Sequence, residues 1–173
     1  KVELSNLSRQ ILFTKKDIGK YKTSVSRNMI KKINNKINTK IFNKKITLEN
    51  INKIAKNYQI ICDGTDNFKS RFLINDYCLS KKKILISSAI SKFDGQLFNF
   101  DFREKTACFR CFMSEDPNVE INCETDGIMT TLAGIAGILQ ANEVIKSILN
   151  VKNTLKGKIM IFNALNINFR KIK

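Results

Sequence analysis

Short apolar runs alternate with amphipathic segments along most of this chain, a pattern typical of a sheet covered by helices. Most of the apolar runs have the length of buried strands. Residues 37–46 alternate roughly between apolar and polar positions, and the run from Phe98 alternates strictly. The strands predicted in this way are residues 2–4, 37–46, 60–62, 84–89, 95–102, 158–162 and 167–170.

Helices are predicted between these strands, where apolar positions recur every three or four residues. The predicted helices are residues 20–35, 48–55, 68–82 and 127–149, and Thr47 is placed to cap the second of them. This order predicts an α/β fold with a mostly parallel sheet, helices on both faces and an antiparallel C-terminal part. Residues 103–125 lack a clear period and are predicted to form a long loop, which is usually functional at such a length.

The stretch 59–67 carries the strongest local sign of a binding site. A short apolar run there ends in Asp63-Gly64-Thr65-Asp66-Asn67, and a helical pattern follows. Ligands of α/β proteins bind at the carboxyl ends of such strands. Asp63 and Asp66 could hold Mg²⁺, which prefers oxygen ligands and usually arrives with substrate phosphates. The alternative is that Asp66 only caps the following helix.

The length and composition of the chain are typical of one soluble domain, and its positive charge bears on which kinds of partner it could bind. The chain has 173 residues, of which 43% are hydrophobic, and a net charge of +16 without any histidine. The lysines are mixed with Asn and Ile, as in residues 30–38, so they predict solvated faces more than a nucleic-acid site. A basic surface would still attract an acidic protein or a nucleotide. The most apolar segment, 127–149, is interrupted by polar and charged residues, so no membrane span is predicted.

The five cysteines fall into two groups. Cys62 and Cys78 lie in apolar segments and are predicted to be small core residues. Cys108, Cys111 and Cys123 cluster in the predicted loop. This arrangement suits metal or thiol chemistry in a reducing compartment, such as the cytoplasm, better than a disulfide framework.

Several motifs, in order along the chain, resemble the ThiF/MoeB/HesA family, relatives of ubiquitin-activating enzymes. The resemblance covers residues 2 to about 170, and four motifs in register are far more specific than any one of them. The motifs are Val2-Glu3-Leu4-Ser5-Asn6-Leu7-Ser8-Arg9-Gln10 with Asp17-Ile18-Gly19-Lys20-Tyr21-Lys22, Asp63-Gly64-Thr65-Asp66-Asn67, Cys108-Phe109-Arg110-Cys111, and Gly127 through Gln140-Ala141-Asn142-Glu143 to Lys146.

The resemblance implies a Rossmann-like adenylyltransferase. Such an enzyme uses ATP and Mg²⁺ to adenylate the C-terminal carboxylate of a small ubiquitin-like sulfur carrier, of the thiamine or the molybdopterin pathway. Small sequence likenesses in residues 9–13 and 122–123 favour the thiamine type slightly. By the family's pattern Arg9 and Lys22 contact the phosphates and Asp66 holds the magnesium. Asn6, Gln10 and Asn67 are expected to help bind the nucleotide.

The cysteines of the loop also acquire roles by resemblance. Cys123 lies where some family members use a cysteine for sulfur transfer or carrier linkage, and an inert loop thiol is the alternative. Cys108 and Cys111 match half of a structural zinc site, which needs four ligands. In relatives the second Cys pair follows slightly after the point where this sequence stops.

We therefore expect residues 1–173 to be one ThiF/MoeB-like adenylation domain, truncated at both ends. The family's glycine-rich phosphate loop would precede Lys1. By analogy we expect a homodimer. A non-catalytic remnant that only binds the carrier or dimerises is the alternative function.

Overall fold

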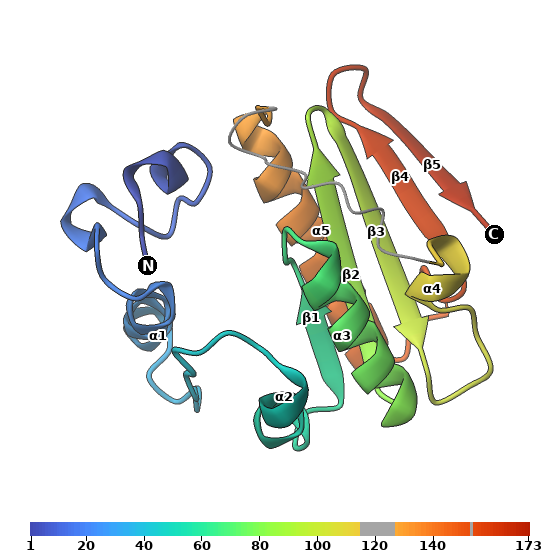
Figure 1. Ribbon diagram of the computed structural model, residues 1–173. Coiled ribbons are helices and arrows are strands. Elements are labelled where there is room, and N and C mark those ends of the chain that lie inside the picture. Colours follow the sequence, from blue (N-terminus) through green and yellow to red (C-terminus); the bar gives the residue numbers. More distant parts are fainter. Residues whose placement is uncertain (115–126, 153) are drawn as a thin grey trace. The chain divides into compact units, whose positions relative to one another are not determined.

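The computed structural model describes residues 1–114, 127–152 and 154–173, and the chain divides into two compact units (Figure 1). The first unit is residues 1–45 and the second is residues 46–173. Cys123 lies outside the described residues.

The first unit is helical. It contains 3₁₀ helices at Leu4–Ser8 and Lys15–Asp17 and helix α1 at Lys22–Ile33, which confirms the helix predicted at 20–35. The strand predicted at residues 2–4 is wrong. Val2 N donates to Lys20 O at 2.9 Å and Gly19 N donates to Val2 O at 2.9 Å, but the chain turns at once into the first 3₁₀ helix.

The strand predicted at residues 37–46 is also wrong, because none of these residues joins a ladder with another described segment. Its alternating pattern is diluted by asparagines, whose side chains hydrogen-bond nearby groups and favour turns. An apolar alternation without a neighbouring strand to pair with does not make a strand.

The second unit is built on a five-stranded sheet in the order β1-β2-β3-β4-β5. The strands are β1 Ile60–Asp63, β2 Ile84–Ser91, β3 Asp94–Asp101, β4 Ile159–Asn163 and β5 Asn168–Ile172. The α/β fold with an antiparallel C-terminal part is confirmed.

Parallel pairing is less extensive than expected: among the described strands it joins only β1 and β2. The reason lies between β2 and β3, where Lys92 and Phe93 alone connect the two strands. A two-residue connection forces the next strand to run antiparallel, whereas a parallel neighbour needs a crossover of a dozen or more residues.

The described part of this unit contains four helices: α2 Leu48–Ala55, α3 Phe68–Ser80, α4 Phe109–Phe112 and α5 Thr130–Ile148. Thr47 is the N-cap of α2 as predicted, and its backbone N–H donates to Asn50 Oδ1 at 3.0 Å. The short α4 falls in the stretch predicted to be loop. No helix among the described residues is long and apolar enough to cross a membrane.

The two faces of the sheet carry different helices, with α3 on one side and α5 on the other (Figure 1). Successive side chains of a strand point to opposite faces, and β2 shows this directly. Leu85 joins the cluster formed with α2, α3 and α4, while Ile84 and Ile86 join the cluster on the α5 side. Helices therefore cover both faces, as predicted.

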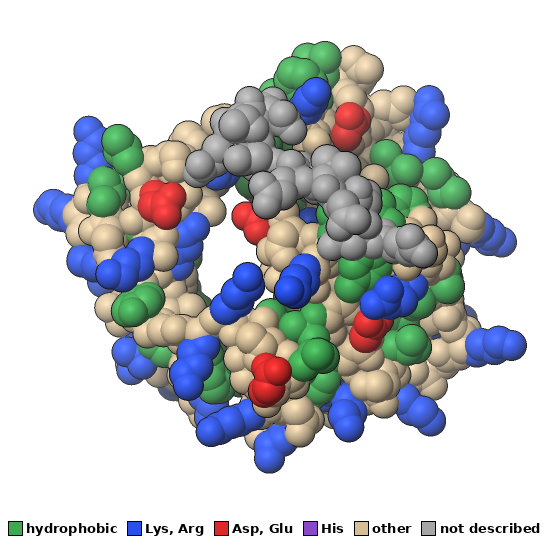
Figure 2. All heavy atoms as spheres, viewed as in Figure 1, with side chains coloured by type: hydrophobic (Ala, Val, Ile, Leu, Met, Phe, Trp, Pro, Cys, Tyr) green, Lys and Arg blue, Asp and Glu red, His purple; other side chains and the backbone are tan. Residues whose placement is uncertain are grey.

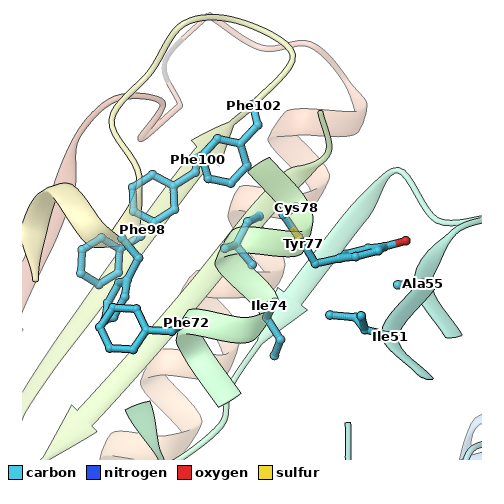
Figure 3. Packing of buried hydrophobic residues seen from close by; sticks show 11 residues of the cluster. Ile51, Ala55, Phe72, Ile74, Tyr77, Cys78, Phe98, Phe100 and Phe102 are labelled. Atoms are coloured by element: carbon cyan, nitrogen blue, oxygen red, sulfur yellow. The ribbon is translucent and has the colours of Figure 1, made fainter. Parts of the chain in front are cut away.

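The cluster on the α3 side is rich in aromatic residues (Figure 3). Phe72 of α3 lies near Phe98 of β3, whereas Tyr77 points from α3 toward Ile51 and Ala55 of α2. Helix α3 is thus packed between the sheet and α2, which fixes the helix that follows the loop at 64–67.

One of the two cysteines predicted to be core residues is buried and the other is not. Cys78 is fully buried in α3, and this burial raises the pKa of its thiol to about 12. Cys62 is exposed, so that prediction is wrong. Cys62 lies on β1, the edge strand of the described sheet, while α5 packs mainly over β2 and β3.

A close approach between β3 and β4 generates a stability prediction. Gly95 pairs with Phe162, and a Cβ at Gly95 would lie 2.0 Å from Cζ of that buried ring. We expect Gly95→Ala to lower the free energy of unfolding by about 1–3 kcal/mol, because the ring must move within a packed core. The midpoint of urea unfolding measures this change.

Gly134→Ala in α5 is the matched control, because a Cβ there meets nothing within 4 Å. Alanine is favoured over glycine inside a helix by about 0.5–1 kcal/mol, so this variant should unfold at an equal or higher urea concentration. Equal midpoints for Gly95→Ala and the wild type would contradict the proposed packing.

Candidate functional site

The carboxyl end of β1 forms the candidate site, together with the loop that leads into α3. Strand β1 ends at Asp63, and Asn67 is the N-cap of α3. The Asn67 side chain accepts a hydrogen bond from Ser70 N at 2.9 Å. Asn67 therefore fills the role that the alternative interpretation gave to Asp66, and that alternative is wrong.

Asp66 is an exposed carboxylate at this loop. It accepts a hydrogen bond from Asn67 Nδ2 at 3.3 Å and has no other partner among the described residues. Because neither the helix cap nor an ion pair occupies it, this side chain is available to a cation. An exposed carboxylate at the carboxyl end of a strand fits the oxygen-rich site that Mg²⁺ prefers.

Asp63 lies in a different environment, although it is only three residues away. Its side chain is buried, and both carboxylate oxygens accept hydrogen bonds. Ser87 Oγ donates to Oδ2 at 2.8 Å, and Thr65 N donates to Oδ1 at 2.9 Å. These bonds satisfy a buried group that would otherwise be costly, so Asp63 is a structural residue of the loop and not a free metal ligand.

Three further residues of the site were missed by the sequence analysis. Ser87 contacts Asp63, Arg71 donates to Thr65 O, and Gln140 Nε2 donates to the carbonyls of Asp63 at 2.9 Å and Ile86 at 2.7 Å. The sequence did contain a signal for these residues, because each is a polar side chain within a strand or helix that is rich in apolar residues. Buried polar side chains usually have hydrogen-bond partners, and here the partners belong to the loop.

The first unit carries the other predicted ligands of the nucleotide. Asn6 is buried, and its Oδ1 accepts from Glu3 N at 3.1 Å, which leaves its amide NH₂ as the available group. Arg9 ends the first 3₁₀ helix, and its Nη1 donates to Ser5 O at 3.2 Å. Lys22 is the first residue of α1.

Gln10 is the remaining predicted ligand in this unit. Its Oε1 is buried and has no hydrogen-bond partner among the described residues. An orphaned acceptor of this kind fits a donor group of a bound molecule. The grouping of Asn6, Arg9, Gln10 and Lys22 with Asp66 stays a prediction.

The Cys-x-x-Cys pair is held by α4. The sulfur atoms of Cys108 and Cys111 lie 3.7 Å apart, a separation compatible with joint ligation of one ion. Among the described residues, no group of three or more His, Cys, Asp or Glu side chains could hold a metal. A four-ligand zinc site at this pair therefore requires ligands from outside the described residues.

Helix α4 is anchored to α3 by polar contacts. Asn75 Oδ1 accepts from Phe109 N at 2.9 Å. Arg110 pairs with Asp76 at 2.9 and 2.7 Å, which lowers the pKa of that carboxyl, and its guanidinium lies 4.6 Å from the ring centre of Phe72. The cysteine pair is thus attached to the same helix that Asn67 caps.

On the visible face of each of the two units, basic side chains are spread among other side chains (Figure 2). This distribution agrees with solvated lysines and gives no sign of an extended nucleic-acid surface on that face.

Comparison with solved structures shows the fold that this chain shares with known proteins. The chain superposes on the Escherichia coli MccB structure that contains ATP with a TM-score of 0.83, at 21% identity over 99% of this chain and 53% of that one. The structure of PaaA gives a TM-score of 0.79 at 17% identity, over 99% and 61%. Both likenesses show a shared α/β fold.

The family follows from the sequence as a whole: the ThiF family matches residues 1–173, and the chain belongs to it. It is 42% identical to the "probable molybdopterin-synthase adenylyltransferase" of Porphyra purpurea, over 99% of this chain and 46% of that protein. It is 32% identical to the "sulfur carrier protein adenylyltransferase" of Thermus thermophilus, over 99% and 66%. The chain spans about half the length of the first of these curated relatives.

The different roles of Asn67 and Asp66 generate a second prediction. Asn67→Ala removes the cap of α3 and should lower the free energy of unfolding by about 1 kcal/mol. Asp66→Ala removes an exposed side chain that is not the cap, so we expect a change within about 0.5 kcal/mol. Urea midpoints of both variants test the assignment, and a larger loss for Asp66→Ala would reverse it.

Proposed function

We propose that this chain is part of an ATP-dependent adenylyltransferase that activates the C-terminal carboxylate of a small ubiquitin-like sulfur-carrier protein. Family membership and the names of the adenylyltransferase relatives support the reaction class. The single observation that carries the proposal is Asp66, an exposed carboxylate at the end of β1 that Asn67 frees from the capping role.

The proposed reaction is a substitution at the α-phosphate of ATP. A carboxylate oxygen of the carrier forms a bond to the α-phosphorus, the bond from that phosphorus to the bridging oxygen breaks, and pyrophosphate leaves with that oxygen. The product is an acyl-adenylate, which a sulfur nucleophile can attack. Negative charge grows on the phosphate oxygens during this step, so cationic groups placed in advance stabilise the transition state.

We assign the stabilisation of this phosphate charge to residues of this chain according to the groups that they carry. Arg9 offers a fork of N–H donors to phosphate oxygens, and Lys22 offers a compact point charge. Gln10, with its orphaned buried acceptor, and Asn6, with its amide donors, are proposed to bind the nucleotide. When bound at Asp66, magnesium would neutralise phosphate charge.

Asn67 contributes to this site in a different way from a ligand. Its Oδ1 is engaged with Ser70 N and its Nδ2 with Asp66, so we propose that it orients the acidic residue and the start of α3. The expectation that Asn67 also touches the nucleotide remains part of the proposal.

The carrier is proposed to be of the molybdopterin-synthase type, because a relative at 42% identity bears that name. The slight preference for the thiamine type, drawn from residues 9–13 and 122–123, is weaker support than a likeness over 99% of the chain. Pull-down of the full-length protein with each purified carrier distinguishes the two.

Three cysteines outside the loop at 64–67 also receive proposed roles. Cys123 is proposed as a thiol for sulfur transfer or carrier linkage. Cys108 and Cys111 are proposed as half of a zinc site completed by residues outside those described. We also propose a homodimer in the cytoplasm.

Exchange of labelled pyrophosphate into ATP by the full-length protein tests the function. Exchange should require both the carrier and magnesium. Asp66→Ala and Arg9→Ala should each reduce its rate on the order of a hundredfold or more, because each removes a preorganised charge from the transition state.

Glu104→Ala is the matched control, since it removes an exposed carboxylate just after β3, at the opposite end of the strands from Asp66: β1 ends beside Ser87, whereas β3 ends beside Ile84 at the start of β2. Its exchange rate should equal that of the wild type. Carrier binding without any exchange would instead favour the non-catalytic alternative, and undiminished exchange in both site variants would refute the residue assignment.

A further inference from the structure

The loop that bears Asp66 is held by residues to which the proposed reaction assigns no contact with substrate. We infer that Ser87, acting through the buried carboxylate of Asp63, is a positioning residue that sets the orientation of Asp66 toward a divalent cation. This inference rests on the proposed function, since it concerns the same site.

The inner side of the loop is fixed by Asp63 and Ser87, which are each 2% exposed. They are direct partners in the parallel pairing of β1 with β2, and their side chains are joined at 2.8 Å. The second oxygen of Asp63 accepts from Thr65 N at 2.9 Å and so bends the chain just before Asp66. The Ser87 hydroxyl therefore holds the carboxylate that shapes the turn.

Helices on opposite faces of the sheet fix the backbone of the same loop. Arg71 of α3 donates to Thr65 O, and Gln140 of α5 donates to Asp63 O at 2.9 Å. Gln140 also donates to Ile86 O at 2.7 Å, next to Ser87. The loop backbone is thus tied to β2, α3 and α5 before any ligand binds.

The position of Asp66 is set mainly by the bonds of the residues on either side of it, because its own side chain makes only one hydrogen bond among the described residues. It lies between Thr65, whose N–H and C=O are both engaged, and Asn67, which caps α3. A ligand held in place before binding loses less entropy when the cation arrives. Outer residues that orient a metal ligand typically change metal affinity or activity by 10- to 100-fold when they are removed.

Ser87→Ala tests the inference in the full-length protein. It leaves one oxygen of Asp63 without its donor, so the turn before Asp66 loses part of its restraint. We expect the magnesium concentration for half-maximal exchange to rise about tenfold, while the KM for the carrier stays unchanged. A purely structural role would lower the amount of folded protein without shifting the magnesium dependence of the remainder.

Ser88→Ala is the matched control. Ser88 is the next residue of β2, is 7% exposed, and its Oγ has no hydrogen-bond partner among the described residues. This variant should keep the wild-type magnesium dependence. If Ser87→Ala is too unstable to purify, Ser87→Cys preserves the space with a weaker donor and should shift the dependence in the same direction by less.

Binding of Mn²⁺ in the presence of ATP, followed by electron paramagnetic resonance, provides a readout that does not depend on catalysis. Its dissociation constant should be about tenfold higher for Ser87→Ala than for the wild type and Ser88→Ala. Unchanged magnesium and Mn²⁺ dependence in Ser87→Ala, or an equal shift in Ser88→Ala, overturns the inference.

The outcomes separate this inference from the proposed function. If the wild type shows no exchange, the function proposed above fails, and the Mn²⁺ titration still decides the role of Ser87. Weaker Mn²⁺ binding in Ser87→Ala alone then supports the positioning role, whereas no binding to any of the proteins refutes it.

Discussion

The parallel pairing of β1 with β2 is the constraint on which the candidate site depends. It sets Asp63 opposite Ser87, on the face of the sheet that α3 covers, and there the two side chains form a buried hydrogen bond. A buried carboxylate must have donors, so this bond and the one from Thr65 N together define the turn that leaves the strand. A shift of the register by one residue would place Ser87 on the opposite face and remove the donor.

Two carboxylates of one short motif consequently have opposite tasks. Asp63 is enclosed by protein and maintains the turn, while Asp66 is exposed to solvent and is the residue to which we assign the cation. Asn67 completes the division by capping α3, which leaves Asp66 free. In the motif Asp-Gly-Thr-Asp-Asn of this chain, the first Asp therefore shapes the turn, the Asn caps the helix, and the second Asp remains exposed.

Predictions that depended on neighbouring residues were mostly correct, whereas predictions that depended on contacts with distant segments were more often wrong. The helix at 48–55 was predictable because its cap, Thr47, and its apolar stripe are local. The helix at 68–82 was also found, but its cap was assigned to the wrong residue, because Asp66 and Asn67 are equally plausible caps until the structure shows that Asn67 accepts from Ser70 N. The supposed strand at 37–46 failed because its pattern needed a partner that the fold does not provide. Cys62 failed for a related reason: an apolar neighbourhood in sequence predicted burial, but its strand lies at the edge of the described sheet.

From the sequence alone came the family, the α/β class and the position of the acidic motif after a buried strand, since all of these depend on residue types at short, ordered spacings. Only the tertiary structure decided which acidic residue is enclosed, which side chain caps α3, and that Ser87, Arg71 and Gln140 converge on one loop. These residues lie far apart in the chain, and their contacts exist only because β2, α3 and α5 pack around the end of β1. The sequence shows that these polar side chains interrupt apolar segments, but which groups they bond depends on three-dimensional packing.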